Sequence, residues 1–159
     1  MAGHLQNSGY EVCVYNRTTS KAKKWAEEFK GNFAETPRLA AQDCDIVFTC
    51  VGNDDDVRQV VFGSDGVLAG MRAGGVLVDH TTASAGLARE LDTALSEREM
   101  SFIDAPVSGG QAGAENGVLT VMAGGDQSTF KKVSPEMEAY AQFSQLMGEA
   151  GSGQLAKMV

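Results

Sequence analysis

The chain has 159 residues, of which 43% are hydrophobic and 21% are charged, and its formal net charge is −8. This length supports one ordinary hydrophobic core, and the composition is typical of a globular protein and not of a disordered one. The acidic balance argues against a general nucleic-acid-binding protein, because such binding rests on basic patches, and no apolar run approaches the ~20 residues of a membrane helix.

Apolar periodicity and the turn residues between segments predict a regular alternation of helices and strands. The predicted helices are Met1–Gly9, Ser20–Phe29, Thr36–Gln42, Val57–Phe62, Ser84–Glu99, Ser128–Tyr140 and Gln154–Val159. The predicted strands are Tyr10–Tyr15, Asp45–Val51, Gly75–Asp79, Met100–Asp104, Leu119–Ala123 and Ala141–Met147. This alternation indicates a doubly wound α/β domain with a mostly parallel sheet.

Individual residues add helix ends, strand burial and a possible helix bend to these predictions. Gly9 is the glycine that closes the first helix. Asp45–Val51 is nearly all apolar, as expected for a strand covered on both faces. Asp126 is expected to cap the helix that follows it, and Pro135 to bend or interrupt that helix.

The three cysteines, Cys13, Cys44 and Cys50, lie in or beside apolar segments. Their odd number and the lack of close metal-ligand spacing predict reduced, buried thiols and no metal site. The opening Met1-Ala-Gly-His-Leu is typical of helix interior and not of a secretory leader. These features favour a cytoplasmic protein.

A glycine-rich stretch, Asp104–Gly117, follows the predicted strand Met100–Asp104. Glycines let the backbone approach a ligand closely and adopt positive φ at little cost. Open α/β sheets bind ligands in loops at the carboxyl ends of their strands. The stretch is therefore predicted to be a ligand loop, with a flexible surface loop as the alternative.

Asn16-Arg17-Thr18 follows the second predicted element, where dinucleotide folds recognise the adenosine ribose. An arginine there suits a 2′-phosphate, because its guanidinium offers a bidentate fork. Thr18 adds a hydroxyl. A solvated arginine before a helix is the alternative.

Two further strand ends carry candidate cofactor residues. Val51 and Gly52 leave the apolar strand at its carboxyl end, where a glycine lets the backbone face a cofactor. Asp56 belongs to the acidic run Asp54–Asp56, for which capping of a helix N-terminus is the favoured interpretation and a cofactor contact the alternative. Thr82 offers a hydroxyl to the nicotinamide end. His80 is interpreted as a solvent-facing or hydrogen-bonded loop histidine.

Lys157 lies near the end of the chain, after Gly151-Ser-Gly153. A solvated helix lysine is the ordinary interpretation of such a residue. A lysine acts as a general acid or base only when burial or neighbouring groups tune its pKa. The local sequence alone does not establish such an environment.

Five stretches, in order, resemble the β-hydroxyacid dehydrogenases, the 3-hydroxyisobutyrate dehydrogenase group. They are Met1-Ala-Gly-His-Leu through Val14-Tyr-Asn-Arg-Thr18, Cys50-Val-Gly-Asn53, Asp79-His-Thr-Thr-Ala-Ser84, Asp104-Ala-Pro-Val-Ser-Gly-Gly110 with Gly113-Ala114 and Gly117, and Gly151-Ser-Gly-Gln-Leu-Ala-Lys-Met-Val159. Ala85 stands where many members carry a proline. Each motif is weak alone, but the ordered set is specific and covers essentially the whole chain.

The resemblance implies a Rossmann-like fold that lacks its first strand and glycine-rich turn, because the chain starts inside what would be the following helix. Residues 1–148 would form an incomplete NAD(P)-binding domain, and residues 149–159 would begin a helix leading to an absent helical domain. With the central strand missing, Tyr10–Tyr15 and Asp45–Val51 would face each other across a gap or pair directly.

The resemblance also implies the chemistry. The parent enzyme would move a hydride between a nicotinamide cofactor and a β-hydroxyacid or its semialdehyde, with NADP favoured over NAD. Ser108, Gly109 and Gly110 would hold the substrate carboxylate, and Lys157 would exchange a proton with the substrate hydroxyl. The residues assigned to the cofactor are Asn16, Arg17, Thr18, Val51, Gly52, Asp56 and Thr82. The parent is expected to be a homodimer or homotetramer.

Two hypotheses follow from the absent segments. The first is a truncated dehydrogenase whose 159-residue chain is inactive by itself, since the pyrophosphate turn and the C-terminal helices are missing. The second is a non-catalytic binding or assembly module that retains part of the fold. The flanking DNA separates the two, because a truncated enzyme would have in-frame coding sequence on both sides.

Overall fold

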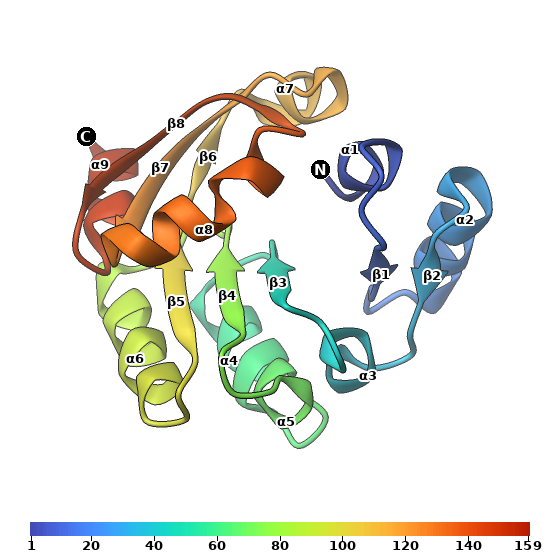
Figure 1. The fold of residues 1–159 in the computed structure, drawn as a ribbon, viewed down its shortest axis with the longest axis horizontal. Helices are drawn as coiled ribbons and strands as arrows, with labels where there is room; N and C mark the ends of the chain where they lie inside the picture. The colour runs from blue at the N-terminus through green and yellow to red at the C-terminus, as the bar shows by residue number, and fades with distance from the viewer.

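The computed structural model describes residues 1–159 as an α/β domain (Figure 1). The helices are α1 (Ala2–Asn7), α2 (Thr19–Phe29), α3 (Pro37–Ala41), α4 (Asp54–Phe62), α5 (Val67–Gly70), α6 (Ala85–Ser96), α7 (Gly110–Asn116), α8 (Gln127–Met137) and α9 (Ser152–Met158). The strands are β1 (Cys13–Val14), β2 (Asn32–Phe33), β3 (Ile46–Thr49), β4 (Val76–Asp79), β5 (Ser101–Asp104), β6 (Val107–Ser108), β7 (Leu119–Gly125) and β8 (Ala141–Gly148).

The strands form two separate sheets. The small sheet contains β1 and β2, paired in parallel. In the large sheet β3, β4 and β5 run parallel, whereas β5 and β6 both pair antiparallel with β7, whose other edge pairs in parallel with β8. The predicted Rossmann-like, mostly parallel α/β fold is confirmed.

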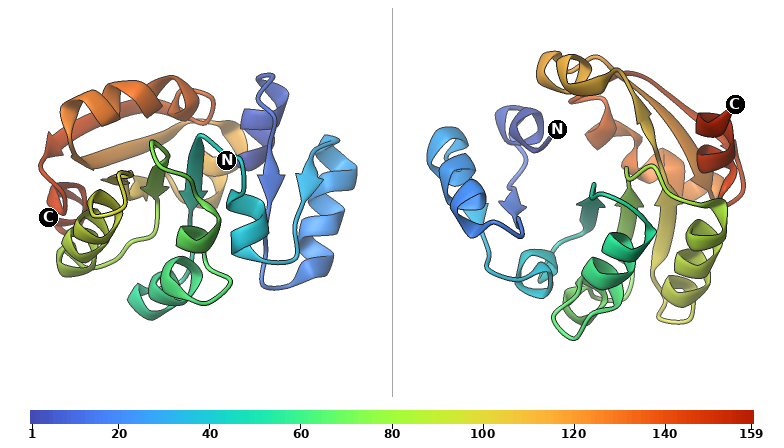
Figure 2. Two further views of the ribbon diagram at one scale, coloured as in Figure 1. Left: turned by 60° about the horizontal axis from the view of Figure 1, so that its bottom comes forward. Right: turned by 180° about the vertical axis from the view of Figure 1, so that it is seen from behind.

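Alternating side chains of the large sheet pack into two cores, one on each face. On β4, Leu77 joins the core under α4, α5 and α6, whereas Val76 and Val78 join the core under α8. On β5, Phe102 and Ile103 divide in the same way. Seen from behind, α4 and α6 lie on the face opposite to α8 (Figure 2). This two-sided burial explains the nearly continuous apolar runs of these strands.

The sequence left open whether Tyr10–Tyr15 and Asp45–Val51 pair, and in the structure they do not. β1 pairs with β2, and β3 forms the edge of the large sheet. Asp45–Val51 is covered on both faces, as expected, but only in part: Ile46 and Phe48 pack against the core under α8, and Val47 packs against the other core. Of β3 only Thr49 is buried, because an edge strand has a neighbour on one side alone.

Helix α1 connects the two sheets. Gly3 lies against α2, where an added Cβ would come within 2.5 Å of the Phe29 ring, so only a glycine allows this approach. Leu5, two residues later, packs into the core under α8. The Nε2–H of His4 donates to the carbonyls of Ala114 and Glu115 at the end of α7, at 2.9 and 3.0 Å.

Several local features differ from the predictions. Strand β2 and helix α5 were not predicted, and the expected loop Asp104–Gly117 contains strand β6 and helix α7. Helix α8 includes Pro135 and continues to Met137 without interruption. Asn53, and none of the following aspartates, caps α4, since its side chain accepts the N–H of Asp56 at 3.0 Å.

The prediction of buried thiols is also wrong. Cys13 and Cys44 are half-buried, and Cys50 is exposed. Burial nevertheless raises the pKa of Cys13 and of Cys44, so both thiols stay protonated at neutral pH. All three cysteines are free.

Candidate active site

Several predicted site residues lie at the carboxyl edge of the large sheet, whereas Asn16, Arg17 and Thr18 follow β1 of the small sheet. Because β3, β4 and β5 are parallel, their carboxyl ends lie at one edge (Figure 1). Val51, Thr82 and Ser108 follow these three strands in turn. Ligands in open α/β sheets bind at such an edge.

Lys157 and Ser108 meet at this edge. The Lys157 Nζ donates a hydrogen bond to the Ser108 Oγ at 2.8 Å, across 49 residues of sequence, and both residues are half-buried. The ordinary interpretation of Lys157 as a solvated helix lysine is therefore wrong. An ammonium or amine and a hydroxyl side by side can share a polar ligand that carries both a carboxylate and a hydroxyl.

Gly109 and Gly110 follow Ser108 directly and have positive φ values of 131° and 60°. A residue with a Cβ would be strained in this conformation. The turn is exposed, and neither glycine N–H donates a hydrogen bond within the chain. Backbone N–H groups of this kind are suitable donors to a carboxylate oxygen.

The start of α9, the helix that carries Lys157, is bound to a buried carboxylate. The Asp104 Oδ1 accepts the N–H of Gly151 at 2.7 Å, and its Oδ2 accepts the N–H of Gln154 at 2.9 Å. Asp104 is fully buried. Burial raises the pKa of Asp104, and the backbone N–H donors oppose that rise.

Gln154 fixes the same helix to the loop after β4. Its side chain is 1% exposed, so its polar atoms need partners within the protein. The Nε2 donates to the carbonyl of Thr81 at 2.7 Å, and the Oε1 accepts the N–H of Ala83 at 2.9 Å. No local sequence pattern indicates a role for Gln154 or for the Asp104 carboxylate.

Three of the predicted cofactor residues lie together near the ends of β1 and β3. The Arg17 Nη1 lies 3.8 Å from the Asp56 Oδ1, and the Arg17 side chain is 85% exposed. An added Cβ at Gly52 would lie 2.5 Å from the Asp56 Oδ2. The guanidinium is thus free to contact an additional anion on its exposed side.

The remaining predicted cofactor residues have mainly local contacts. The Asn16 Oδ1 accepts the N–H of Thr18 at 2.9 Å, which fixes the turn after β1. The Val51 N–H donates to the hydroxyl of Thr81 at 3.0 Å. Thr81 is buried, whereas Thr82 is exposed and its hydroxyl has no partner in the chain.

Asp79 joins β3 to the end of β4. Its Oδ1 accepts the hydroxyl of Thr49 at 2.8 Å and the N–H of Thr81 at 3.1 Å. Burial raises the pKa of Asp79, and the hydrogen bonds from Thr81 and Thr49 oppose that rise. The residue holds the two strand ends in register under the site.

His80 is buried and fully hydrogen-bonded, so the solvent-facing interpretation is wrong. Its Nδ1 lies 2.6 Å from the Ala105 carbonyl, which only accepts, so Nδ1 carries the proton. Its Nε2 then accepts the Tyr140 hydroxyl at 2.7 Å, and burial raises the pKa of that hydroxyl. Burial lowers the pKa of His80 to about 4, so the ring is neutral at pH 7.

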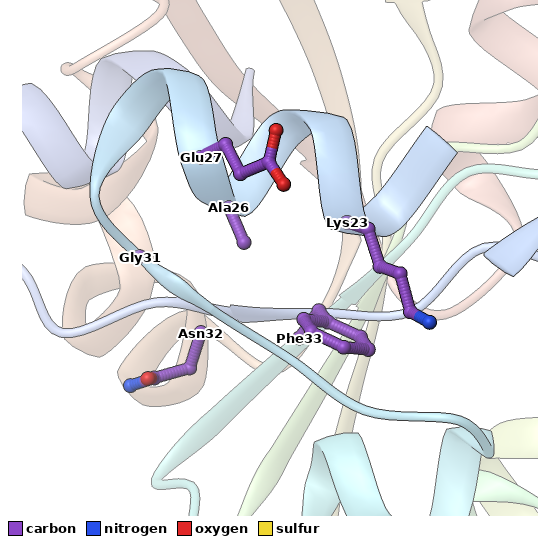
Figure 3. A pocket seen from close by; sticks show the side chains of 6 residues that line it. All are labelled: Lys23, Ala26, Glu27, Gly31, Asn32 and Phe33. Atoms are coloured by element: carbon purple, nitrogen blue, oxygen red, sulfur yellow. The ribbon is translucent and has the colours of Figure 1, made fainter. Parts of the chain in front are cut away.

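Two surface hollows lie beside α2. One, of 430 Å³, is lined by Lys23, Ala26, Glu27, Gly31, Asn32 and Phe33 (Figure 3). The Lys23 ammonium stands 5.7 Å from the Phe33 ring, and no predicted site residue lies there. The other, of 250 Å³, includes Asn16 and lies at the end of β1.

No group of three or more His, Cys, Asp or Glu side chains is placed to hold a metal ion. No helix has both the length and the apolar character needed to cross a membrane.

Known proteins share this fold and sequence. A family model described as the NAD binding domain of 6-phosphogluconate dehydrogenase matches residues 1–150. An uncharacterised oxidoreductase of Shewanella frigidimarina is 59% identical over 159 residues, which are 100% of this chain and 55% of that protein. A probable mitochondrial 3-hydroxyisobutyrate dehydrogenase-like protein of Arabidopsis thaliana is 45% identical, over 99% of this chain and 47% of that protein.

A solved structure agrees with these relatives. Mycobacterium tuberculosis 3-hydroxyisobutyrate dehydrogenase, in a structure with L-serine, superposes with a TM-score of 0.91 at 31% identity. The superposition covers 98% of this chain and 52% of the other. The chain thus spans about half the length of the proteins that it matches.

Fold and matches together define the class, an NAD(P)-binding domain similar to those of dehydrogenases. The chain belongs to the family of the NAD-binding domain of 6-phosphogluconate dehydrogenase, and its relatives are 3-hydroxyisobutyrate dehydrogenase-like oxidoreductases. The resemblance found in the sequence motifs is confirmed.

The His80 environment predicts a pH-dependent stability. The folded-state pKa of about 4 lies below the unfolded value of 6.5, so the unfolded chain binds more protons between these pH values. Stability should therefore be complete above pH 6.5 and fall by about 3 kcal/mol as the pH drops to 4. Replacing His80→Asn keeps a donor for Ala105 and should remove this part of the pH dependence in urea unfolding. Equal pH slopes for variant and native chain would contradict the assignment.

Proposed function

We propose that this chain is the NAD(P)-binding and substrate-binding part of an oxidoreductase that acts on a β-hydroxyacid or its semialdehyde, of the 3-hydroxyisobutyrate type. The observation that carries the proposal is the 2.8 Å contact between Lys157 and Ser108. It joins the two residues to which the motif resemblance gave the proton-transfer and carboxylate-binding roles.

In this proposal, some residues of the chain bind the substrate and one transfers a proton. The Ser108 hydroxyl and the N–H groups of Gly109 and Gly110 bind the substrate carboxylate. Lys157 takes the proton from the substrate hydroxyl during oxidation and returns it during reduction. A bound nicotinamide would supply the hydride chemistry, while the protein orients the reactants.

The same proposal assigns the cofactor site. Arg17 and Thr18 bind the 2′-phosphate of NADP, with Asn16 shaping their turn, while Val51 and Gly52 present backbone to the cofactor. The exposed guanidinium of Arg17 and its place after β1 support NADP over NAD. Asp56 positions Arg17 from the other side, and Thr82 offers its free hydroxyl to the nicotinamide end.

The proposal also concerns domain organisation. Residues 1–148 form an incomplete NAD(P)-binding domain, and residues 149–159 begin the helix that leads toward a further, helical domain. The separation of β1 and β2 from the large sheet supports a cofactor site without the usual central strand. The full-length protein would be a homodimer or homotetramer in the cytoplasm.

Replacing Lys157→Met in the full-length protein should lower kcat by about 10²- to 10⁴-fold, because the proton-transfer group is lost. The dissociation constant for NADP, measured by fluorescence, should stay within about twofold of the unmodified enzyme. Lys131→Met, on the exposed side of α8, is the matched control and should leave both quantities unchanged. A Lys157→Met enzyme with normal kcat would refute the catalytic role.

Replacing Arg17→Ala should weaken NADP binding by about 10- to 100-fold and leave NAD binding nearly unchanged, because only NADP carries the 2′-phosphate. Calorimetric titration with both cofactors measures the preference. Arg98→Ala, beyond the end of α6, is the control. An unchanged NADP/NAD ratio in Arg17→Ala would show that another group recognises the phosphate.

The purified 159-residue chain should not oxidise 3-hydroxyisobutyrate with either cofactor. Its sequence contains no G-x-G-x-x-G turn, and such a turn places backbone N–H groups on the pyrophosphate. The assay follows absorbance of the reduced nicotinamide at saturating substrate. Turnover above the no-enzyme rate would show that these residues suffice for catalysis.

A further inference from the structure

We propose that Asp104 and Gln154 are positioning residues. They hold Lys157 beside Ser108, so that the Lys157 amine can reach the hydroxyl of a substrate whose carboxylate is bound at Ser108. This inference rests on the proposed function of Lys157. It goes further by naming two buried side chains that control the geometry without touching the substrate.

Asp104 lies between the Ser108 segment and the helix that carries Lys157. Asp104 ends β5, and four residues later the same segment reaches Ser108. Its carboxylate accepts the N–H groups of Gly151 and Gln154, at the start of the helix that carries Lys157. One side chain therefore joins the segment of Ser108 to the helix of Lys157.

Glycines surround the Asp104 carboxylate closely. An added Cβ at Gly124 would lie 2.5 Å from the Asp104 Oδ1, and one at Gly153 would lie 2.8 Å from its Oδ2. Gly151 adopts a positive φ of 93°, which turns the chain into the helix. With glycines on these sides, the carboxylate and the helix start have little room to shift.

The Gln154 side chain is a second group that fixes helix α9. The Gln154 side chain binds Thr81 and Ala83, which follow β4, by two hydrogen bonds of 2.7 and 2.9 Å. Gln154 lies three residues before Lys157 in α9, so rotation of this short helix about its axis would break both bonds. Asp104 thus fixes the start of the helix, and Gln154 fixes its rotation.

The same contacts exclude a competing interpretation. Gly151-Ser-Gly153-Gln-Leu-Ala156 at a helix start has the spacing of a weak phosphate-binding motif, G-x-G-x-x-A. The N–H groups of Gly151 and Gln154 already donate to Asp104. A phosphate would have to approach a buried carboxylate, so this helix start holds an internal anion and not a cofactor.

The test compares Asp104→Asn and Gln154→Met in the full-length protein. Asn keeps the shape of Asp104 but turns an amide group toward a backbone N–H, and Met keeps the length of Gln154 without its hydrogen bonds. Matched controls are Asp65→Asn and Gln59→Met, whose side chains are exposed and make no hydrogen bond. Having two anchors keeps the test valid if one variant fails to fold.

Two readouts are expected to change. Amide hydrogen exchange of residues 152–158 should accelerate by about tenfold or more, while exchange in β4 and β5 stays the same. kcat per folded molecule should fall by about 10- to 100-fold with KM for the cofactor within twofold, because the proton-transfer group is misplaced. A purely structural role would lower the folded fraction but not kcat per folded molecule.

Two results would overturn the proposal. Unchanged exchange of residues 152–158 in the folded variants would show that the two side chains do not anchor the helix. Faster exchange with unchanged kcat per folded molecule would show that helix position does not control the chemistry. Full activity of Lys157→Met would instead refute the proposed function itself, and the exchange data would still report on the anchor.

Discussion

The buried carboxylate of Asp104 is the contact on which the arrangement of the site depends. Burying an ionised carboxylate is costly unless hydrogen bonds replace its water, and here two backbone N–H groups from the start of α9 do so. Helix α9 has only seven residues, and a helix of that length is not stable alone in water. Each hydrogen bond to a charged group contributes about 1.5–3 kcal/mol, so the carboxylate and the helix stabilise one another. Lys157 reaches Ser108 because this mutual stabilisation holds.

The sequence predicted the parts of the fold that have a clear period or a clear cap. β4 and β5 were predicted because strands buried on both faces are continuously apolar, and α6 because Leu87, Leu91 and Leu95 recur at helical spacing. β2 has two residues and α5 has four, too few to show any period. In the site, the motif resemblance named Ser108 and Lys157. The side-chain partners of Gln154 lie more than 70 residues away in the chain, and no local pattern shows such a contact. The one sequence signal for Asp104 was an acidic residue ending an apolar strand.

The part of the candidate site around Lys157 and the part around Arg17 are held by interactions of different strength. Around Lys157 the contacts are buried and charge-assisted, whereas Arg17 meets Asp56 at 3.8 Å with most of its side chain in solvent. Exposed ion pairs contribute at most about 1 kcal/mol. The small sheet therefore depends for its position on apolar packing. In α1, Gly3 meets α2 and Leu5 enters the core of the large sheet, and in α3, Ala41 is buried in the core under α4, α5 and α6. The geometry around Lys157 is thus set by polar contacts, and the geometry around Arg17 by apolar packing.

The buried polar groups at the carboxyl edge are hydrogen-bonded within the chain. Asp79, His80, Asp104 and Gln154 all have partners within the chain, and the one buried side-chain polar atom that lacks a partner belongs to Glu136 on α8. Tyr140 and the Ala105 carbonyl fix the His80 ring in one tautomer, so the segment leading to Ser108 is held from a second side. Donors fixed in advance need little reorganisation when charge develops on a ligand. In the proposed function, the Ser108 hydroxyl and the unpaired N–H groups of Gly109 and Gly110 are such donors. The buried residues beneath them supply the rigidity, and only the outermost groups remain for the substrate.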